Sequence, residues 1–304
     1  MIWKGLLAHG TGISLPCTDP AIAEKALKDC LQDEPLLFDV GSVQLSLSPS
    51  SMSLHPQYTL TEEAFTDAVF AVRDALQSFR KTRKGKPTAE IIKDLHDWIV
   101  TTITYTRTEE EAIHEAWHVF QHHAGVCDGI AKAAKILLDD SRIPSRIIHG
   151  TSSQNDEEPT GHAWNLILEE DKWYHYDFTF DTTLSEGSDA IHYDYCRLSE
   201  AQIRKDHDYD ASSIKDLATD DADWFRTSDR YFTSKKKLRI YIRSCLAANQ
   251  SAISFRLPFT SDPCHTRDTI CTLVHEELSR ALAPGSSYSV SFNEGQMVMT
   301  VYCH

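Results

Sequence analysis

The chain lacks several features of secreted and membrane-bound proteins. Its 304 residues include eight cysteines, but no two of these form a Cys-x-x-Cys pair, so we expect free thiols and no zinc ribbon. No apolar run is long enough to span a membrane, and the N-terminus lacks the apolar segment of a signal peptide. We therefore expect a cytoplasmic location, or secretion if a leader has been removed.

Basic residues are also scarce relative to acidic ones. Lys and Arg number 30 against 45 Asp and Glu, which gives a formal net charge of −15 at pH 7. A surface of this sign repels nucleic acids and anionic membranes. Two short basic runs, residues 80–86 and 235–237, stand among acids and are typical of solvated loops or helix ends. We therefore expect neither a nucleic acid nor a membrane as a partner.

Periodic patterns of apolar residues run along most of the chain. Helical spacing predicts helices over 19–33, from 61 to the first basic run, over 88–101 and 109–121, and from 127 to about 142. Alternating or continuous apolar runs predict strands within 36–48 and over 146–150, 162–168 and 173–180, with a Ser- and Pro-rich loop at 48–56. From about residue 234, the pattern predicts helix, strand, helix, strand and strand.

Cys127 is the first candidate for chemistry. It lies in the segment Gly-Val-Cys-Asp-Gly, residues 125–129, where a helix is expected to begin. Unpaired N–H groups and the helix dipole stabilise a thiolate at such a position, and acyl transfer needs a thiolate nucleophile. A small buried structural residue is the alternative for a lone cysteine at a helix start, so other residues must decide.

Two strands downstream supply a histidine and a carboxylate. The strands are joined by the polar link 169–172 and are expected to form a hairpin. If Leu168 pairs with Trp173, His162 and Asp177 become diagonal neighbours on one face of the sheet. A carboxylate beside an imidazole fixes its tautomer and stabilises the imidazolium. The pattern therefore indicates a nucleophile, a base and a group that orients the base.

Three motifs together resemble the signatures of the transglutaminase-like superfamily. They are Gly-Val-Cys-Asp-Gly around Cys127, Gly-His-Ala-Trp-Asn around His162, and Trp-Tyr-His-Tyr-Asp-Phe-Thr-Phe-Asp around Asp177. Their order matches the family, as does the Ile-Pro-Ser-Arg-Ile-Ile-His-Gly strand between the first two. The resemblance extends over about residues 90–210 and includes the segment from Leu198 to His207.

The resemblance implies an α+β fold. The nucleophile helix of such a papain/transglutaminase-like core packs on an antiparallel sheet. We expect this core at residues 61–230. It would follow an N-terminal α/β segment at 1–60 and precede a small C-terminal α/β domain at 231–304.

The resemblance also implies covalent acyl transfer on amide bonds of a peptide or protein substrate. Cys127 would attack the carbonyl, His162 would move the proton and Asp177 would orient His162. Water or an amine would then take the acyl group from the thioester. Protease, amidase and transglutaminase all stay open, as does the oligomeric state. This chemistry requires no cofactor and no metal.

Two further residues are candidates for the same site. The backbone N–H of Cys127 is the first candidate for an oxyanion donor. Gln121, six residues earlier, is the second, because papain-like proteases carry a glutamine donor in that region. Trp164 follows His162 closely, and we expect it to pack beside the triad and shield it from water.

Two interpretations of other classes stay open beside the cysteine enzyme. The run His114-Glu115-Ala116-Trp117-His118 fits H-E-x-x-H, which on a helix could bind zinc with Glu115 as general base of a metallopeptidase. No third ligand follows in a recognised pattern, which favours a fortuitous match. The other interpretation is a catalytically silent binding or scaffold module that retains the fold.

The segment that begins at Asp206 starts like a calcium loop. Ala211 stands at the sixth position, where the turn needs glycine, and Leu217 stands at the twelfth, where glutamate is needed. We therefore interpret this segment as an acidic, solvated loop.

Overall fold

The computed structural model describes residues 2–48, 50–108, 110–153, 158–188, 190–259, 266–281 and 286–304. Helices occur together with largely antiparallel sheets, so the chain is an α+β protein, as expected. It divides into two compact units, Met1–His149 with His162–Leu168 and Gly150–Gly161 with Glu169–His304. Among the helices within these described ranges, none is both long and apolar enough to cross a membrane. The three-part division at 60/61 and 230/231 stays a prediction.

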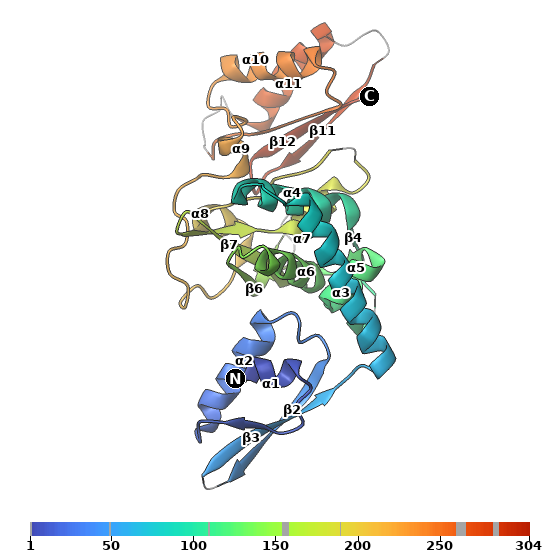
Figure 1. Ribbon diagram of the computed structural model, residues 1–304. Helices are drawn as coiled ribbons and strands as arrows, with labels where there is room; N and C mark the ends of the chain where they lie inside the picture. Colours follow the sequence, from blue (N-terminus) through green and yellow to red (C-terminus); the bar gives the residue numbers. More distant parts are fainter. Residues whose placement is uncertain are drawn as a thin grey trace. The chain divides into compact units, whose positions relative to one another are not determined.

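The first unit begins with a small antiparallel sheet in the order β1-β3-β2. Its strands are β1 (Ile13–Leu15), β2 (Val40–Ser48) and β3 (Ser51–Tyr58). Two helices, α1 (Ile2–Leu7) and α2 (Pro20–Asp33), lie on one face of this sheet (Figure 1). The predicted helix over 19–33 is confirmed by α2. Its N-cap is Asp19, whose side chain accepts a hydrogen bond from the N–H of Ala21 at 2.9 Å.

The Ser- and Pro-rich segment 48–56 is not the predicted loop. Most of it forms β3, which pairs with both β1 and β2. Met52 and Leu54 are almost fully buried under the helices, so the burial of alternate residues outweighs the low strand propensity of Ser and Pro. Pro56 is tolerated because it lies opposite Val43, where the pairing register shifts in a bulge.

The helices predicted between residues 61 and 142 are present, with one interruption. Those at the predicted places are α3 (Glu62–Thr82), α4 (Thr88–Thr102) and α6 (Cys127–Asp140). The predicted helix over 109–121 is instead a short 3-10 turn, η1 (Glu111–His114), followed by α5 (Ala116–His122). Glu115 between them is extended, which lets its carboxylate accept a hydrogen bond from Lys132 of α6 at 2.8 Å. Two short strands, β4 (Thr104–Tyr105) and β5 (Ala124–Gly125), pair in parallel.

A four-stranded sheet has the order β8-β7-β6-β9. The predicted strands are present as β6 (Ser145–Ser152), β7 (Thr160–Glu169) and β8 (Lys172–Tyr176), and β9 (His207–Asp208) pairs antiparallel with β6. The predicted strand over 173–180 is too long, because a helix, α7 (Phe178–Ser185), begins within it. Asp177 caps this helix, so Thr179 is helical and does not extend the hairpin.

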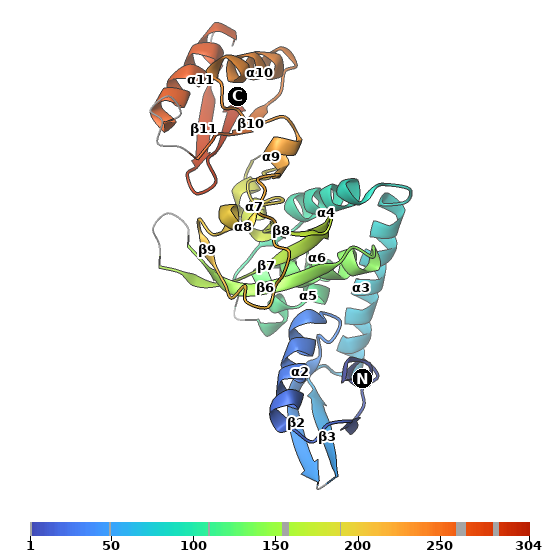
Figure 2. The same cartoon turned by 90° about the vertical axis from the view of Figure 1, so that its left-hand side faces the viewer.

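The C-terminal part of the second unit forms a sheet of its own, in the order β10-β12-β11. After the short helices α8 (Glu200–Ile203) and α9 (Trp224–Thr227) come α10 (Lys235–Ala247), β10 (Ala252–Arg256), α11 (Arg267–Ala281), β11 (Tyr288–Asn293) and β12 (Val298–Cys303). This order confirms the predicted one. Helices α10 and α11 cover one face of the sheet (Figure 2).

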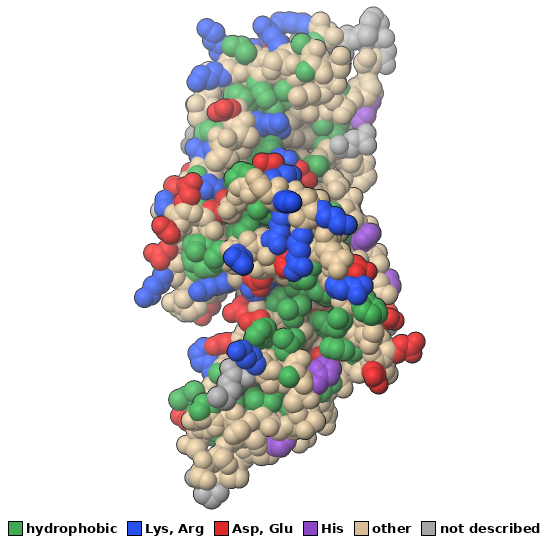
Figure 3. All heavy atoms as spheres, viewed as in Figure 1, with side chains coloured by type: hydrophobic (Ala, Val, Ile, Leu, Met, Phe, Trp, Pro, Cys, Tyr) green, Lys and Arg blue, Asp and Glu red, His purple; other side chains and the backbone are tan. Residues whose placement is uncertain are grey.

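The two basic runs lie at helix ends, as predicted. The run 235–237 begins α10, and the run 80–86 spans the end of α3 and the loop before α4. Figure 3 shows Lys and Arg side chains at the surface over α10 and α11.

Candidate active site

Cys127 is the first residue of α6 and is half-buried. The preceding residue, Val126, is extended and offers no side-chain hydrogen bond to the helix N-terminus. The thiol therefore lies at the positive end of the helix dipole, beside N–H groups that Val126 does not cap. Cys127 packs against the buried side chains of Ala131, Ile147 and Ala163. This cluster sets the start of α6 against β6 and β7.

Gly129 lets the first turn of α6 approach the η1 backbone closely. A Cβ atom at this position would lie 2.5 Å from the carbonyl oxygen of Ile113 and 3.1 Å from a methyl group of Val119. The second contact could relax, because it is made by a side chain, but the first is with backbone. The glycine two residues after Cys127 is therefore a packing requirement of α6.

Charged groups also fix this first turn. The Lys132 ammonium lies 2.8 Å from the Glu115 carboxylate and 3.0 Å from that of Asp128, whose other oxygen lies 3.2 Å from Nε2 of His149. Burial raises the pKa of Asp128, but His149 and Lys132 outweigh this effect and hold the pKa below its usual value. Burial also raises the pKa of Glu115, against the opposing charge of Lys132. These pairs connect α6 with the residue before α5 and with β6.

His162 lies near the start of β7 and is largely buried. Its ring is nearly parallel to that of Trp164, with centroids 5.9 Å apart and an interplanar angle of 19°. On the same strand, Asn165 donates a hydrogen bond from Nδ2 to the carbonyl oxygen of Ala131 at 3.0 Å. Because Ala163 and Asn165 both contact α6, the strand that carries His162 is fixed to the helix that carries Cys127.

Asp177 is buried and its carboxylate is held on both oxygens. Oδ1 accepts hydrogen bonds from the backbone N–H groups of Thr179 and Phe180, both at 3.0 Å, so the side chain caps α7. Oδ2 lies 3.0 Å from Nε2 of His207, in a pair whose side chains are fully buried. The carboxylate thus has a fixed orientation.

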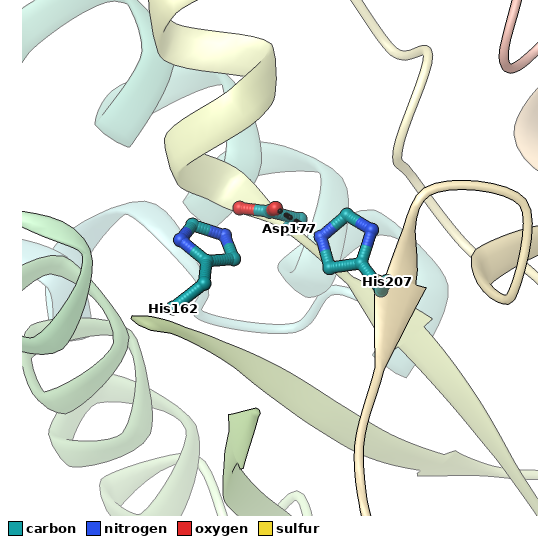
Figure 4. A group of neighbouring side chains, drawn as sticks. All are labelled: His162, Asp177 and His207. Atoms are coloured by element: carbon teal, nitrogen blue, oxygen red, sulfur yellow. Dashed lines mark hydrogen bonds and ion pairs between the residues drawn. The ribbon is translucent and has the colours of Figure 1, made fainter. Parts of the chain in front are cut away.

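The structure brings the predicted base and its orienting group together with a second histidine. The polar atoms of His162, Asp177 and His207 all lie within 4.8 Å of one another. Figure 4 shows the Asp177 carboxylate between the two imidazole rings, at the start of α7. A carboxylate in this place can orient an imidazole and stabilise its protonated form.

The remaining candidates for the oxyanion donor and the pocket differ in their surroundings. Trp164 is buried beside His162, and its role in shielding the triad stays a prediction. Gln121 is an exposed residue of α5 and lines a cavity of about 950 Å³ with Asp74, Trp98 and Leu137. Its role as an oxyanion donor stays a prediction.

The zinc alternative depended on two histidines one helical turn apart, and this condition is not met. His114 ends η1, whereas His118 belongs to α5, and Glu115 between these elements is extended. The Glu115 carboxylate pairs with Lys132, and Nδ1 of His118 lies 3.2 Å from the carbonyl oxygen of Ala124. The H-E-x-x-H match does not form the helical site that the pattern requires.

His207 is the site residue that the sequence interpretation missed. The acidic composition around it predicted a solvated loop, but its side chain is fully buried between the carboxylates of Asp177 and Asp206. The prediction was wrong because carboxylates compensate the cost of burying His207, and one of them, Asp177, lies far away in sequence. The available signal was its place at the end of the segment that resembles the superfamily.

A comparison with protein families matches the part of the chain that holds Cys127, His162 and Asp177. Residues 77–178 match the family model described as the transglutaminase-like superfamily. The sequence has no match among curated proteins. One similar solved structure is described only as a candidate cysteine protease, from Cytophaga hutchinsonii, with 14% identity, a TM-score of 0.32, and coverage of 58% of this chain and 70% of that chain.

Two other solved structures are similar to the chain. A TGase has 12% identity and a TM-score of 0.33, with 60% of this chain and 52% of that chain covered. Menin has 12% identity and a TM-score of 0.30, with 93% and 56% covered. This chain thus spans little more than half of the length of each of these two proteins.

Proposed function

We propose that this chain, whose residues 77–178 match the family model of the transglutaminase-like superfamily, transfers acyl groups from amide bonds of a peptide or protein through a thioester on Cys127. The observation on which the proposal rests is that His162 lies close to the Asp177 carboxylate, each of whose oxygens is hydrogen-bonded to other groups. A second observation supports it: Cys127 starts a helix that packs on the residue next to His162.

The proposed reaction uses Cys127, His162, Asp177 and backbone N–H groups at the start of α6. The Cys127 thiolate attacks the amide carbonyl carbon, and the oxyanion that forms accepts hydrogen bonds from backbone N–H groups at the start of α6. The His162 imidazolium gives its proton to the departing amine as the C–N bond breaks, which leaves a thioester. His162 then takes a proton from water or an amine, which attacks the thioester and releases the thiolate. Asp177 would keep His162 oriented throughout.

The catalytically silent alternative makes a different prediction about the thiol. A scaffold needs the fold but no reactive cysteine, so its Cys127 would behave like an ordinary half-buried thiol. An enzyme forms a covalent intermediate on Cys127 and on no other residue. Trapping that intermediate separates the two interpretations without knowledge of the natural substrate.

The experiment uses p-nitrophenyl esters of short acyl chains, because an activated ester acylates the thiolate without requiring specific recognition. After an acid quench, intact-mass and peptide mass spectrometry should find one acyl group on Cys127. Cys127→Ala should remove the adduct, whereas Cys271→Ala, at a cysteine that is also half-buried, should retain it. No adduct on the wild type, or an adduct that persists in Cys127→Ala, would favour the scaffold. Adding a primary amine then separates transamidation from hydrolysis.

A further inference from the structure

A buried run of ionisable groups extends from Asp177 away from His162. His207 lies 3.0 Å from the Asp177 carboxylate through Nε2 and 2.6 Å from the Asp206 carboxylate through Nδ1. Both ring nitrogens therefore face carboxylate oxygens, and an imidazole that donates to both must carry two protons. Burial alone lowers the pKa of His207, but its hydrogen bonds to Asp177 and Asp206 and their charges outweigh this effect and raise the pKa.

Asp206 is itself held by a turn of the C-terminal sheet. Its second oxygen accepts hydrogen bonds from the hydroxyl of Tyr195 at 2.6 Å and from Nε2 of Gln296 at 3.3 Å. Gln296 is fully buried in the turn between β11 and β12. In the same turn, a Cβ atom at Gly295 would lie 2.9 Å from the Asp206 carboxylate. The turn fits closely against Asp206, and the fit depends on this glycine.

Other contacts attach the C-terminal sheet without involving Asp206. The Tyr302 hydroxyl lies 2.7 Å from Nε2 of His192. The buried Arg256 guanidinium lies 3.1 Å from the Asp223 carboxylate and donates a hydrogen bond to the carbonyl oxygen of Asp194 at 2.6 Å. Attachment of the sheet and support of Asp206 are therefore made by different residues and can be tested separately.

We propose that Asp206 and His207 are positioning residues of the acyl-transfer centre, and that the β11–β12 turn completes this centre by holding Asp206. The proposal rests on the proposed function, in which Asp177 orients His162. Backbone N–H groups hold one oxygen of Asp177, and His207 holds the other. Without His207, the carboxylate would keep its helix-capping bonds but could turn about them. The β11–β12 turn of the C-terminal sheet would thus support the site.

The test measures the alkylation rate of Cys127 by iodoacetamide between pH 5 and 9, by peptide mass spectrometry. His207→Leu should lower the rate at pH 6 roughly tenfold, by analogy with the lower end of the 10- to 100-fold loss that follows removal of a partner that orients a metal-binding histidine. His207→Gln should recover most of the rate, because its side-chain amide can still donate to Asp177. Gln296→Leu should cause a smaller decrease, and Tyr302→Phe should match the wild type.

Each failure has a distinct meaning. If wild-type Cys127 is no more reactive than the other cysteines, the proposed function fails, and this inference falls with it. If wild-type Cys127 is activated but the His207 and Gln296 variants keep its full pH profile, the positioning roles are wrong. If Tyr302→Phe slows alkylation as much as Gln296→Leu, loosening of the whole sheet explains the effect, and the turn has no special role. If His207→Leu does not fold, Gly295→Ala, which presses on Asp206 from the turn, must slow alkylation or the inference falls.

Discussion

Replacing Gly129 by alanine tests whether the packing of the nucleophile helix controls the thiol. Gly129 is the third residue of α6, two residues after Cys127. The added Cβ atom would lie 2.5 Å from the carbonyl oxygen of Ile113, roughly 0.8 Å closer than the shortest ordinary C···O contacts of about 3.3 Å. Because the neighbour is backbone, either η1 or the first turn of α6 must move.

Two opposing terms set the size of the effect. Alanine in place of glycine favours a helix by about 1 kcal/mol. Overpacking costs about 1–3 kcal/mol, and a backbone neighbour places the cost near the upper end. We expect a net loss of about 2 kcal/mol, which corresponds to a fall in Tm of about 4–8 °C. If the first turn of α6 moves and η1 stays in place, alkylation of Cys127 should slow by about 10- to 100-fold.

The assay compares thermal unfolding and Cys127 alkylation in Gly129→Ala and in a matched control. Gly161→Ala adds the same methyl group directly before His162, where nothing lies within 4 Å of the added Cβ. The control should unfold and react like the wild type. A Gly129→Ala protein that is as stable as the wild type, or more stable, with equal thiol reactivity, would refute the packing argument.

Two further predictions concern charged groups around the site. Lys132→Met leaves the Glu115 and Asp128 carboxylates without their shared cation and should lower the unfolding free energy, measured in urea at pH 7, by about 1–3 kcal/mol. The control Lys25→Met removes one partner of an exposed pair with Asp29 and should cost about 0.5 kcal/mol. Equal losses would contradict a special role for Lys132. Glu200 has a pKa of about 2, because hydrogen bonds from His175, Tyr209 and Arg204 outweigh burial. Its contribution to stability is present above the unfolded pKa of about 4.3 and is lost as the pH falls towards 2. Wild type and Glu200→Gln should therefore differ in unfolding free energy at pH 6 and converge near pH 2, and a difference independent of pH would contradict this assignment.

Local sequence patterns predicted much of the fold. The start of a helix at Asp19 and the apolar periodicity of α3, α4 and α6 are local signals, and the structure confirms them. The C-terminal order of helices and strands was predictable for the same reason. Three motifs in one order also predicted the transglutaminase-like segment, which the family match over residues 77–178 confirms.

The surroundings of Asp177 were not predictable from local patterns. The aromatic and β-branched residues after it favour a strand by propensity, yet the chain turns into α7. Asp is a preferred N-cap, but this preference competed with a longer run of strand formers. The cap is nevertheless what fixes the carboxylate.

The burial of His207 depended on contacts distant in sequence. Its partner Asp177 lies 30 residues before it, and Gln296, which supports Asp206, lies 90 residues after Asp206. Acidic residues next to a histidine are common in solvated loops, so composition favoured exposure. Only the fold brings together the partners that make burial of these charges tolerable.

The most direct test of the central claim is the reactivity of Cys127 at pH 6, measured with iodoacetamide and peptide mass spectrometry on the wild type and His162→Ala. We expect Cys127 to be alkylated much faster than the other cysteines of the chain, because its thiolate is paired with an imidazolium, and we expect this advantage to disappear without His162. A Cys127 that reacts like an ordinary thiol, or that reacts equally fast without His162, would contradict the account.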